Sequence, residues 1–446
     1  MDGALKMGRD RRYQSWSRYP RARHEVHCLY WRDALLPKAN NKPMLPYGNG
    51  RSYGDSCLND GGVLLDARGL DRFINFDSAT GLFRCEAGIL LADILALIVP
   101  QGWFLPVTPG TRYVTVGGAI ANDVHGKNHH RAGTFGCHVR CFEILRSNGQ
   151  RLVCSPEQNA DWFRATVGGL GLTGAILWAE IALKRISNPY IDGEIIRFRN
   201  LERFFELTAD SDRDYEYTVA WLDCLARGRS LGRGLFTRGN HAAALSRKRP
   251  KSSGPQPSLP VELPFSLVNK VTLHLFNSLY YHKQLVNRRR VVSHYESFFY
   301  PLDGIHAWNR LYGPRGFLQY QCVVPPESSR EALGEILNRI AASRTGSFLA
   351  VLKGFGQQCS PGMLSFPRPG VTLALDFPNR GKPTLELLDR LDEVVEAAGG
   401  AIYPAKDAHM SGRIFRKGFP EWKAFSAYID PAFSSSFWRR VMERNA

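Results

Sequence analysis

The chain has 446 residues, of which 44% are apolar and 22% are charged, as in an ordinary soluble globular protein. At about 100–200 residues per domain, this length predicts two to four domains. Lysine and arginine outnumber the acidic residues 58 to 41, a net charge of +17. Most of these charges are expected on a solvated surface, but the excess favours anionic partners: nucleic acid, anionic lipid, or phosphorylated substrates and cofactors.

The cysteines predict reduced thiols. Nine of them, an odd number, are scattered from Cys28 to Cys359 without a CxxC motif, so neither a disulfide framework nor a zinc ribbon is indicated. The first residues are basic but lack the apolar core of a signal peptide. No run of the sequence approaches the ~20 apolar residues of a membrane-spanning helix. We therefore expect a cytoplasmic protein.

Residues 13–186 have the pattern of one block that mixes helices and strands. A hairpin is predicted at 141–154, where apolar alternation flanks the Asn148-Gly149 turn. Apolar spacing predicts the other elements: strands at 63–66, 82–88 and 175–186, and helices at 89–102 and 156–169.

A second block is expected at 187–400. Strands at 217–223 and 317–325 and long helices at 329–342 and 382–400 indicate an antiparallel sheet with helices on one face. Within this block, 246–264 is rich in basic, serine and proline residues and is expected to be disordered. A helical run follows with Val268, Val271, Leu275 and Leu279 on one face, so that 246–281 is predicted as a mobile segment.

Two glycine-rich stretches raise the question of a bound phosphate. YGNGRSYGD (47–55) can form a nest of backbone N–H groups with Arg51 adding charge, although a plain turn fits equally well. GLGLTG (169–174) has the spacing of a dinucleotide fingerprint. However, a helix precedes it and a strand follows, the reverse of that motif, so the match is coincidental. Its glycines still allow a backbone to approach a flat ligand closely.

The stretch TPGTRYVTVGGAIANDVHGKNHH (108–130) is the most informative. A loop enters a small-residue helix whose N-terminus can face a phosphate. His125 and His129 stand four residues apart near Asp123, so zinc must be considered, but Gly126 and Asn128 interrupt any helix there. Three histidines beside Lys127 also suit acid–base chemistry, with His130 read as a surface residue. Together the glycine-rich stretches indicate a long phosphate-bearing ligand with a flat ring, which points to FAD.

These segments resemble, in order and spacing, the FAD-linked oxidases of the vanillyl-alcohol-oxidase type, from about residue 13 to the C-terminus. Further similar stretches are WNRLYGPRGFLQYQ, SFLAVLKGFG, LSFPRPG, LDFP and YPAKD. The resemblance implies an α+β fold. A two-part FAD-binding domain would comprise 13–186 and a C-terminal return at 401–446, with a substrate domain at 187–400 that has an antiparallel sheet and helices on one face.

The resemblance also implies site residues. Many relatives attach FAD through a histidine in the first glycine loop, but this chain has Arg51 there and no histidine between 46 and 56, so FAD is expected to be non-covalent. The implied substrate contacts are Lys127, Trp221, Gln319, Gln321, Lys353, Phe355 and Lys406. The implied FAD contacts are Tyr47, Gly48, Asn49, Gly50, Arg51, Ser52, Tyr53, Gly54, Asp55, Gly110, Thr115, Val116, Gly117, Gly118, Asn122, Asp123, Val124, His125, Ile176 and Tyr403.

The chemistry implied is oxidation of a secondary hydroxyl of a sugar to a ketone, with the hydride passing to flavin N5. The sequence is most similar to members that act on the 2′-hydroxyl of a polyprenylphosphoryl-β-D-ribose, the first half of a 2′-epimerisation that an NAD(P)H-dependent keto-sugar reductase completes. His125 is the expected catalytic base and Lys406 its orienter or an alternative base, while Lys127, Lys353 and Lys406 would hold the sugar phosphate. No metal is expected.

Departures from the family pattern leave the exact sugar and lipid open: Ala374, Thr372 and Phe299 stand where mycobacterial members carry Cys, Asn and Tyr. The alternative is a soluble polyol or aldonolactone oxidase of the same flavin class. A basic nucleic-acid-binding protein is more remote, because no recognition motif accompanies the charge. Basic residues at 247–251 and 288–290 favour a lipid phosphate and a peripheral contact with the inner face of the cell membrane.

Overall fold

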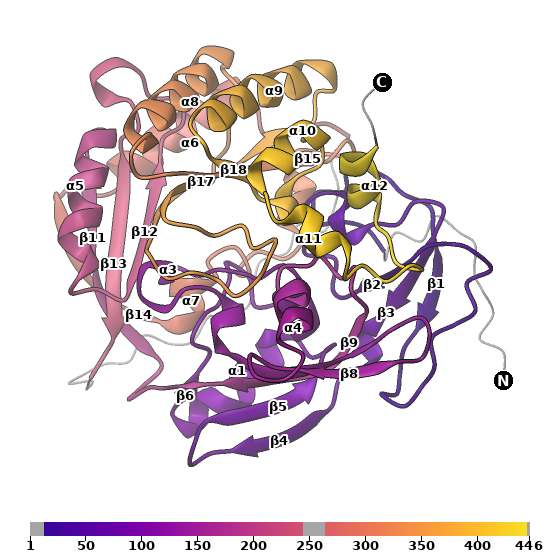
Figure 1. The fold of residues 1–446 in the computed structure, drawn as a ribbon. Coiled ribbons are helices and arrows are strands. Elements are labelled where there is room, and N and C mark those ends of the chain that lie inside the picture. The colour runs from indigo at the N-terminus through magenta and orange to yellow at the C-terminus, as the bar shows by residue number, and fades with distance from the viewer. Residues whose placement is uncertain (1–12, 244–263, 444–446) are drawn as a thin grey trace.

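A computed structural model describes residues 13–243 and 264–443 (Figure 1). The first half of the chain builds two small sheets. One is parallel with strand order β1-β3-β2, and the other is antiparallel with order β4-β5-β9-β7-β8. The strands are β1 (Glu25–Cys28), β2 (Met44–Tyr47), β3 (Val63–Asp66), β4 (Phe73–Asp77), β5 (Leu82–Glu86), β7 (Val139–Leu145), β8 (Arg151–Cys154) and β9 (Ala175–Ala182), with a short pair β6 (Trp103–Phe104) and β10 (Lys184–Arg185) beside them.

Local sequence explains these elements. The run VLLD of β3 is buried along its length, as a central parallel strand should be. The predicted hairpin is confirmed as β7 and β8. In α1 (Leu91–Ile98) the apolar residues recur at helical spacing and face the core, and Gly102 ends the following turn at a φ of 78°. The other helices of this half are α2 (Val116–Ala121), α3 (His129–Ala132) and α4 (Ala160–Thr166).

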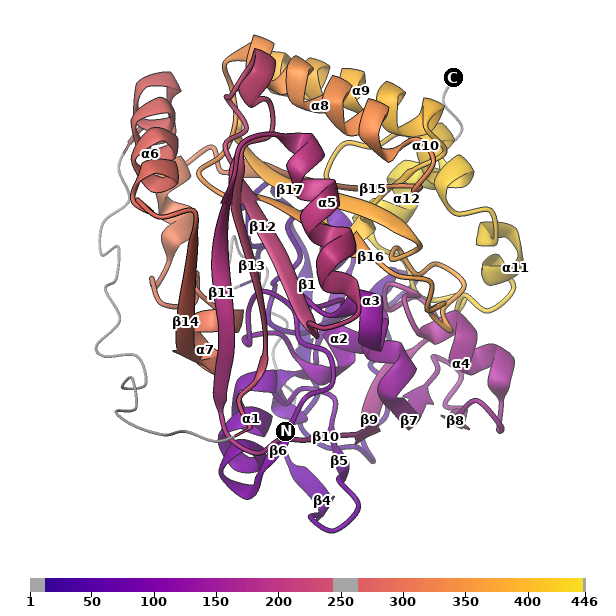
Figure 2. The same ribbon diagram turned by 90° about the vertical axis from the view of Figure 1, so that its left-hand side faces the viewer.

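The second half builds one eight-stranded antiparallel sheet of order β14-β11-β13-β12-β16-β17-β15-β18. Helices α5 (Leu201–Asp212), α8 (Ser329–Ser343) and α9 (Lys382–Ala397) cover one face of it (Figure 2), which confirms the expected α+β arrangement. The strands are β11 (Tyr190–Phe198), β12 (Tyr217–Leu222), β13 (Gly234–His241), β14 (Arg288–His294), β15 (Phe317–Val324), β16 (Ala350–Phe355), β17 (Gly370–Pro378) and β18 (Ala401–Ile402).

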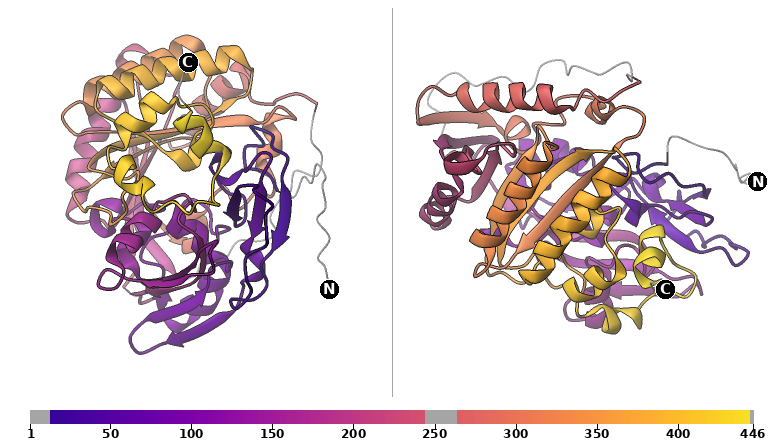
Figure 3. Two further views of the ribbon diagram at one scale, coloured as in Figure 1. Left: turned by 45° about the vertical axis from the view of Figure 1, so that its right-hand side comes forward. Right: turned by 90° about the horizontal axis from the view of Figure 1, so that it is seen from above.

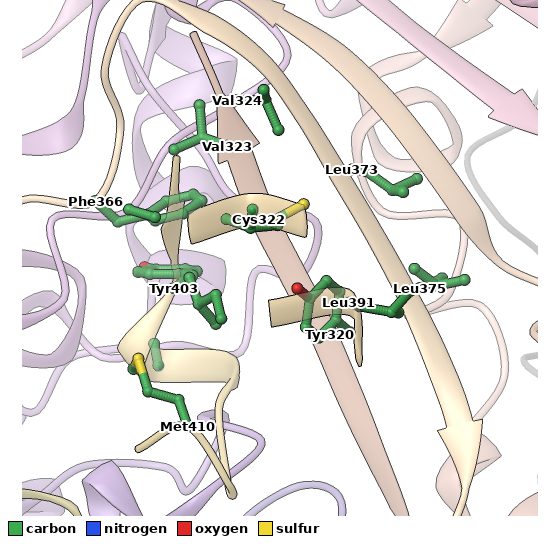
Figure 4. Close-up of a cluster of buried hydrophobic side chains, with 14 of the residues drawn as sticks. Tyr320, Cys322, Val323, Val324, Phe366, Leu373, Leu375, Leu391, Tyr403 and Met410 are labelled. Carbon is green, nitrogen blue, oxygen red and sulfur yellow. The ribbon is translucent and has the colours of Figure 1, made fainter. Parts of the chain in front are cut away.

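Strand alternation divides this sheet into an apolar face and a polar face. On β15, Tyr320 and Cys322 point toward the helices and pack with Leu391 of α9 (Figure 4), whereas Gln319 and Gln321 point the other way. Seen from above, α8 and α9 lie side by side along the apolar face (Figure 3). The polar face is therefore left free to line a cavity against the first half of the chain.

The C-terminal segment returns to the first half. After β18, the helices α10 (Gly412–Gly418), α11 (Trp422–Ser426) and α12 (Ser436–Met442) pack back toward β2 and the turn that follows the first glycine loop. This path matches the direction of the expected return, but β18 itself belongs to the larger sheet. The division of the chain at 186 and 400 stays a prediction.

The segment expected to be mobile is partly regular. Its first part, 246–263, lies outside the described residues, but α6 (Lys270–His282) begins with a complete capping box at Asn269. Val268 precedes this helix and is 1% exposed in a separate apolar cluster, so it does not share a face with Val271 and Leu275 as predicted. The last helix of this region is α7 (Tyr295–Phe299). No helix within 13–243 or 264–443 is long and apolar enough to span a bilayer.

Candidate active site

A cavity of about 590 Å³ lies between the first half of the chain and the polar face of the large sheet. Its walls come from segments that are far apart in the sequence. The first half contributes the glycine loop after β2 and the stretch 108–127, the sheet contributes residues from each of β11 to β17, and the return segment contributes 403–406. The fold thus brings together the stretches that the sequence marked as separate motifs.

The glycine loop needs glycine because other groups approach its backbone. A side chain at Gly48 would collide with Thr115, and Gly50 has a φ of 58° with the Tyr47 hydroxyl against it. Asn49 fixes the loop by donating to the carbonyl of Tyr113 at 2.8 Å. The result is a thin backbone wall along the cavity.

Arg51 is the charged group of this wall. Its guanidinium lies 4.2 Å from the ring centre of Trp16, and its Nε is buried without a hydrogen-bond partner among the described residues. Burial lowers the pKa of Arg51, although Asp303 nearby opposes the shift. A buried guanidinium with an unused N–H group favours an anionic ligand.

The stretch 115–121 supplies the second thin wall. Thr115 caps α2 by accepting a hydrogen bond from Gly118 N at 3.2 Å, and Gly117 and Gly118 leave the backbone open to the cavity. Tyr403 closes the far side, where its hydroxyl donates to the carbonyl of Asn122 at 2.8 Å. These narrow walls and the unpaired Arg51 fit a flat ring carrying a pyrophosphate. The donor set therefore fits FAD.

His125 follows α2 and lies 7% exposed beside the cavity. The amide Nε2 of Gln321 donates to His125 Nε2 at 2.9 Å and to Thr372 Oγ1 at 3.2 Å. The Thr372 hydroxyl is itself the donor to Cys322 O, at 2.8 Å. Because that hydroxyl is used as a donor, it accepts from Gln321, and the second amide hydrogen reaches the imidazole. His125 is therefore neutral with its proton on Nδ1.

The surroundings of His125 support the neutral form. Its ring packs against Phe355 at 5.0 Å and Tyr403 at 5.4 Å between centroids, and its Nδ1 has no partner among the described residues. Burial, followed by the charges of Lys353 and nearby groups, lowers its pKa well below the usual value.

Three half-buried lysines lie around this histidine. Lys127 Nζ donates to the carbonyl of Phe299 at 2.9 Å, Lys353 Nζ lies 3.4 Å from the carbonyl of Gly126, and Lys406 Nζ lies 3.6 Å from the ring centre of Tyr53. Burial lowers the pKa of Lys127 to about 8 and those of Lys353 and Lys406 to about 7. The cluster is therefore a cationic pocket in which Lys353 and Lys406 lose their protons near pH 7.

Sequence reasoning missed the carboxylate of this cluster. Asp376 on β17 accepts from Gln319 Nε2 at 2.7 Å and from the Tyr312 hydroxyl at 3.3 Å. Burial raises the pKa of Asp376 to about 7, against the opposing effect of Gln319 and Lys406. The sequence did contain a sign of this residue, because Asp376 is the one acid inside the apolar run LALDFP. A carboxylate in such a run is expected to be buried and to need hydrogen-bond partners.

The structure brings most of the predicted site residues to the cavity. Other cavity residues were missed, among them Trp16, Tyr280 and Asp303. The predicted residues that line the cavity are Tyr47, Gly48, Asn49, Gly50, Arg51, Ser52, Tyr53, Gly110, Thr115, Gly117, Gly118, Asn122, Val124, His125, Lys127, Ile176, Trp221, Gln319, Gln321, Lys353, Tyr403 and Lys406.

Five predicted residues lie elsewhere. Gly54 packs its backbone on the Asp407 carbonyl and Asp55 pairs with Arg440, while Val116 is fully buried in the apolar core. Asp123 instead fixes a turn by accepting from Gly136 N at 2.8 Å and from Ser365. Phe355 lies behind His125 and His129. These residues support the walls of the cavity and do not line it.

The zinc alternative finds no support in the geometry. His129 does not line the cavity, its Nδ1 accepts from Gly356 N at 3.2 Å, and its ring stacks on Phe355. The lysines around His125 would repel a cation. Among the described residues, the cluster with metal-ligand spacing is instead Asp389, Asp392 and His409.

In that cluster, the neighbouring carboxylates favour the protonated form of His409. Burial lowers the pKa of His409, but its ion pairs with Asp392 and Asp407 outweigh that effect and raise this pKa to about 10. A metal ion would have to displace that proton.

The site and fold define an oxidoreductase that uses FAD, and comparison with known proteins agrees. Residues 35–155 match the FAD binding domain family. The chain is 39% identical over 410 residues to decaprenylphosphoryl-beta-D-ribose oxidase of Mycolicibacterium smegmatis, covering 88% of each chain. It is 35% identical over 373 residues to an uncharacterized protein in the mprA 5′ region of Streptomyces coelicolor, covering 79% of this chain and 100% of that one.

A third relative shares only part of the chain. Delta(24)-sterol reductase of Homo sapiens is 29% identical over 150 residues, 33% of this chain and 29% of its own. The long match to the mycobacterial enzyme includes both the cofactor half and the large sheet. The chain belongs to the FAD-linked oxidases, in the family of decaprenylphosphoryl-beta-D-ribose oxidase.

Proposed function

We propose that this protein oxidises the 2′-hydroxyl of a polyprenylphosphoryl-β-D-ribose to a ketone. The observation that carries the proposal is the trio of half-buried lysines, Lys127, Lys353 and Lys406, beside the thin cofactor walls. Charges that are largely removed from water need partners, and a phosphodiester between sugar and lipid would supply one. The substrate in the name of the Mycolicibacterium relative has such a group.

FAD, when bound, supplies the hydride acceptor, and the chain supplies binding, orientation and proton transfer. The residues at 47–53 and 115–118 would hold the cofactor, non-covalently, since no histidine occurs between 46 and 56. Arg51 would supply positive charge to its phosphates.

We assign the base to Lys406 instead of His125. His125 Nε2 already accepts a hydrogen bond from Gln321, and the proton on Nδ1 makes the ring a donor. Lys406 lines the same cavity, and its pKa of about 7 leaves a large neutral fraction to take the hydroxyl proton. Lys127 and Lys353 then hold the phosphate, and Gln319 and Gln321 orient the sugar.

Two further parts of the proposal concern a contact with the membrane and a partner reductase. Val271, Leu275 and Leu279 expose an apolar face of α6, and Arg289 lies on the nearby edge strand β14. This combination fits a peripheral contact with an anionic membrane. All nine cysteines are free thiols, in keeping with the inner face of the membrane. The ketone product requires an NAD(P)H-dependent reductase to complete a 2′-epimerisation.

The alternative, a polyol or aldonolactone oxidase, has a relative in L-gulonolactone oxidase of Mus musculus, 31% identical over 144 residues but covering only 32% of this chain. A neutral polyol offers Lys127 and Lys353 no phosphate to bind, which disfavours it.

One experiment separates these functions. The yellow holoprotein is mixed without oxygen with decaprenylphosphoryl-β-D-ribose, with ribitol or with L-gulonolactone, and flavin absorbance is followed. We expect bleaching by the phosphoribose alone, with a 2′-ketone in the product. Bleaching by the free polyol or lactone would favour the alternative. A colourless protein that is retained on DNA would favour the nucleic-acid-binding function. We do not expect this result.

A further inference from the structure

We propose that the lipid chain of the substrate leaves the site along Val351, Leu349 and Trp221 and emerges beside Phe276 on α6. This inference rests on the proposed function and adds a binding site for a polyisoprenoid chain. It explains why an exposed aromatic residue on α6 is joined by ring contacts to the interior of the cavity.

The path begins at the phosphate end. Lys353 lies on β16, and Val351 and Leu349 follow it on the same side, all three lining the cavity. At a rise of about 3.3 Å per residue, the four steps along the chain from Lys353 back to Leu349 extend roughly 13 Å. The strand thus leads away from the cationic cluster over apolar side chains.

Trp221 is the second wall of this path. It stands opposite Val351 in the pairing of β12 with β16, and its Nε1 donates to the carbonyl of Phe348 at 2.8 Å. Because the polar atom of the indole is satisfied by the backbone, its ring presents only apolar surface to the cavity.

A series of aromatic side chains in contact continues from Trp221 to the surface. Tyr280 lies 4.6 Å from Trp221 between centroids, and Phe276 stacks on Tyr280 at 5.5 Å with an interplanar angle of 17°. Phe276 also meets Phe348 at 4.8 Å and is 38% exposed. Ring contacts therefore connect the cavity wall at Trp221 with solvent at Phe276, and Lys283 Nζ lies 3.4 Å from the ring centre of Tyr280.

The residues of α6 on this path differ from those that anchor the helix and from those on its outer face. Leu273, Asn277 and Tyr281 are buried and anchor α6 to the body of the protein, while Leu275 and Leu279 face outward. Phe276 and Tyr280 lie between these two faces, at the rim of the cavity. The occupant is a lipid chain because the path is continuous with the pocket that holds the phosphate.

The cavity lining also includes residues of β11, β13, β14 and α7, and we call this part of the lining the second arm. It is lined in part by the hydroxyl groups of Thr237, Ser293 and Ser297, although Val291 also belongs to it. A polyisoprenoid has no hydrogen-bonding groups to satisfy such hydroxyls, so the α6 path fits it better.

The test uses the holoenzyme in detergent micelles with two substrates that share the phosphoribose and differ in the chain, farnesyl or decaprenyl. The wild type is expected to show a higher kcat/KM for the decaprenyl substrate. Phe276→Ser should reduce the decaprenyl-to-farnesyl ratio by about tenfold, because an aromatic contact with the chain is lost. Phe276→Leu should restore most of the ratio.

Controls separate this path from its rivals. Leu285→Ser, at a residue 86% exposed just past α6, should leave the ratio unchanged. A ratio that is lost in Val291→Ser and kept in Phe276→Ser would overturn the path in favour of the second arm. Equal ratios in the wild type and Phe276→Ser would also overturn it.

Failure of the proposed function has a different signature. If neither phosphoribose bleaches the flavin of the wild type, the substrate is wrong. Equilibrium binding of decaprenyl phosphate and farnesyl phosphate to the holoprotein then decides the path alone. A preference for decaprenyl phosphate that Phe276→Ser removes would support it, and no preference in the wild type would refute it.

Discussion

Gln321 on β15 donates its amide hydrogen to His125 Nε2 at 2.9 Å. The contact couples the polar face of the large sheet to the stretch that follows α2. Thr372 holds Gln321 in this orientation, since its hydroxyl is committed to Cys322 O. The imidazole therefore serves as a neutral donor through Nδ1. We therefore expect Lys406, which lines the same cavity, to remove the substrate proton.

The first prediction tests that assignment. Lys406→Ala should retain FAD but slow anaerobic flavin reduction by about 10²–10⁴-fold, the usual contribution of a general base. Added primary amines should recover part of the rate, because a small amine can fill the space left by the side chain. His129→Ala is the matched control, since this residue lies outside the cavity. If His125→Ala is slowed more strongly and amines do not rescue Lys406→Ala, the base is His125.

The second prediction concerns pH. A base must be neutral to accept a proton, so flavin reduction should rise as pH increases through about 7, the pKa of Lys406. Asp376 raises that pKa by its charge. Asp376→Asn should therefore move the rising limb of the rate profile to lower pH, as measured by stopped-flow reduction across pH 5 to 9. A limb that stays in place or moves to higher pH would contradict the coupling.

The third prediction concerns the cofactor link. Because the loop at 46–56 has Arg51 and no histidine, heat or acid should release all the flavin as FAD. The measurement is the flavin content of the supernatant and of the washed precipitate. Flavin that stays with the denatured chain would refute a non-covalent site.

The fourth prediction concerns the outer face of α6. Val271, Leu275 and Leu279 are 73%, 58% and 62% exposed, so Leu275→Ser with Leu279→Ser should weaken flotation with anionic liposomes. The FAD content should not change, since neither residue reaches the cavity. Flotation equal to that of the wild type would remove α6 as the membrane contact.

Local patterns predicted the elements well, because each depends on neighbours in the sequence. The hairpin around Asn148-Gly149 and the helix from Ser329 follow from turn chemistry and apolar spacing. The resemblance to known oxidases predicted cofactor contacts, most of which line the cavity. What local patterns could not give was the partner of each polar group, because Gln321 and His125 are 196 residues apart in the chain. Only the folded sheet shows that the histidine is already hydrogen-bonded and that Asp376 joins the lysines.

The same limit applies to Asp55, which the sequence assigned to the cofactor. In the structure, Arg440 of α12 donates to Asp55 Oδ1 at 2.7 Å and to Asp407 Oδ2 at 2.8 Å. Burial opposes ionisation of Asp407, but Arg440 and His409 outweigh it and hold its pKa well below the usual value. The ion pair thus joins the C-terminal helix to the end of the glycine loop and to the residue after Lys406.

The last prediction tests the ion pairs of Arg440 with Asp55 and Asp407. Arg440→Met should destabilise the holoprotein by about 3–5 kcal/mol, because two buried carboxylates lose their counter-ion. Arg413→Met breaks an exposed pair with Glu396 and should cost at most about 1 kcal/mol. Asp407 has a lowered pKa in the folded state, so its contribution is present above its unfolded pKa and is lost as pH falls through that range. The gap in thermal midpoint between wild type and Arg440→Met should therefore be wide from pH 7 down to about pH 4, the unfolded pKa of an aspartate, and shrink below it, with weaker FAD retention in the variant. An equal gap in both arginine variants, or one that widens in acid, would show that this pair does not hold the cofactor loop.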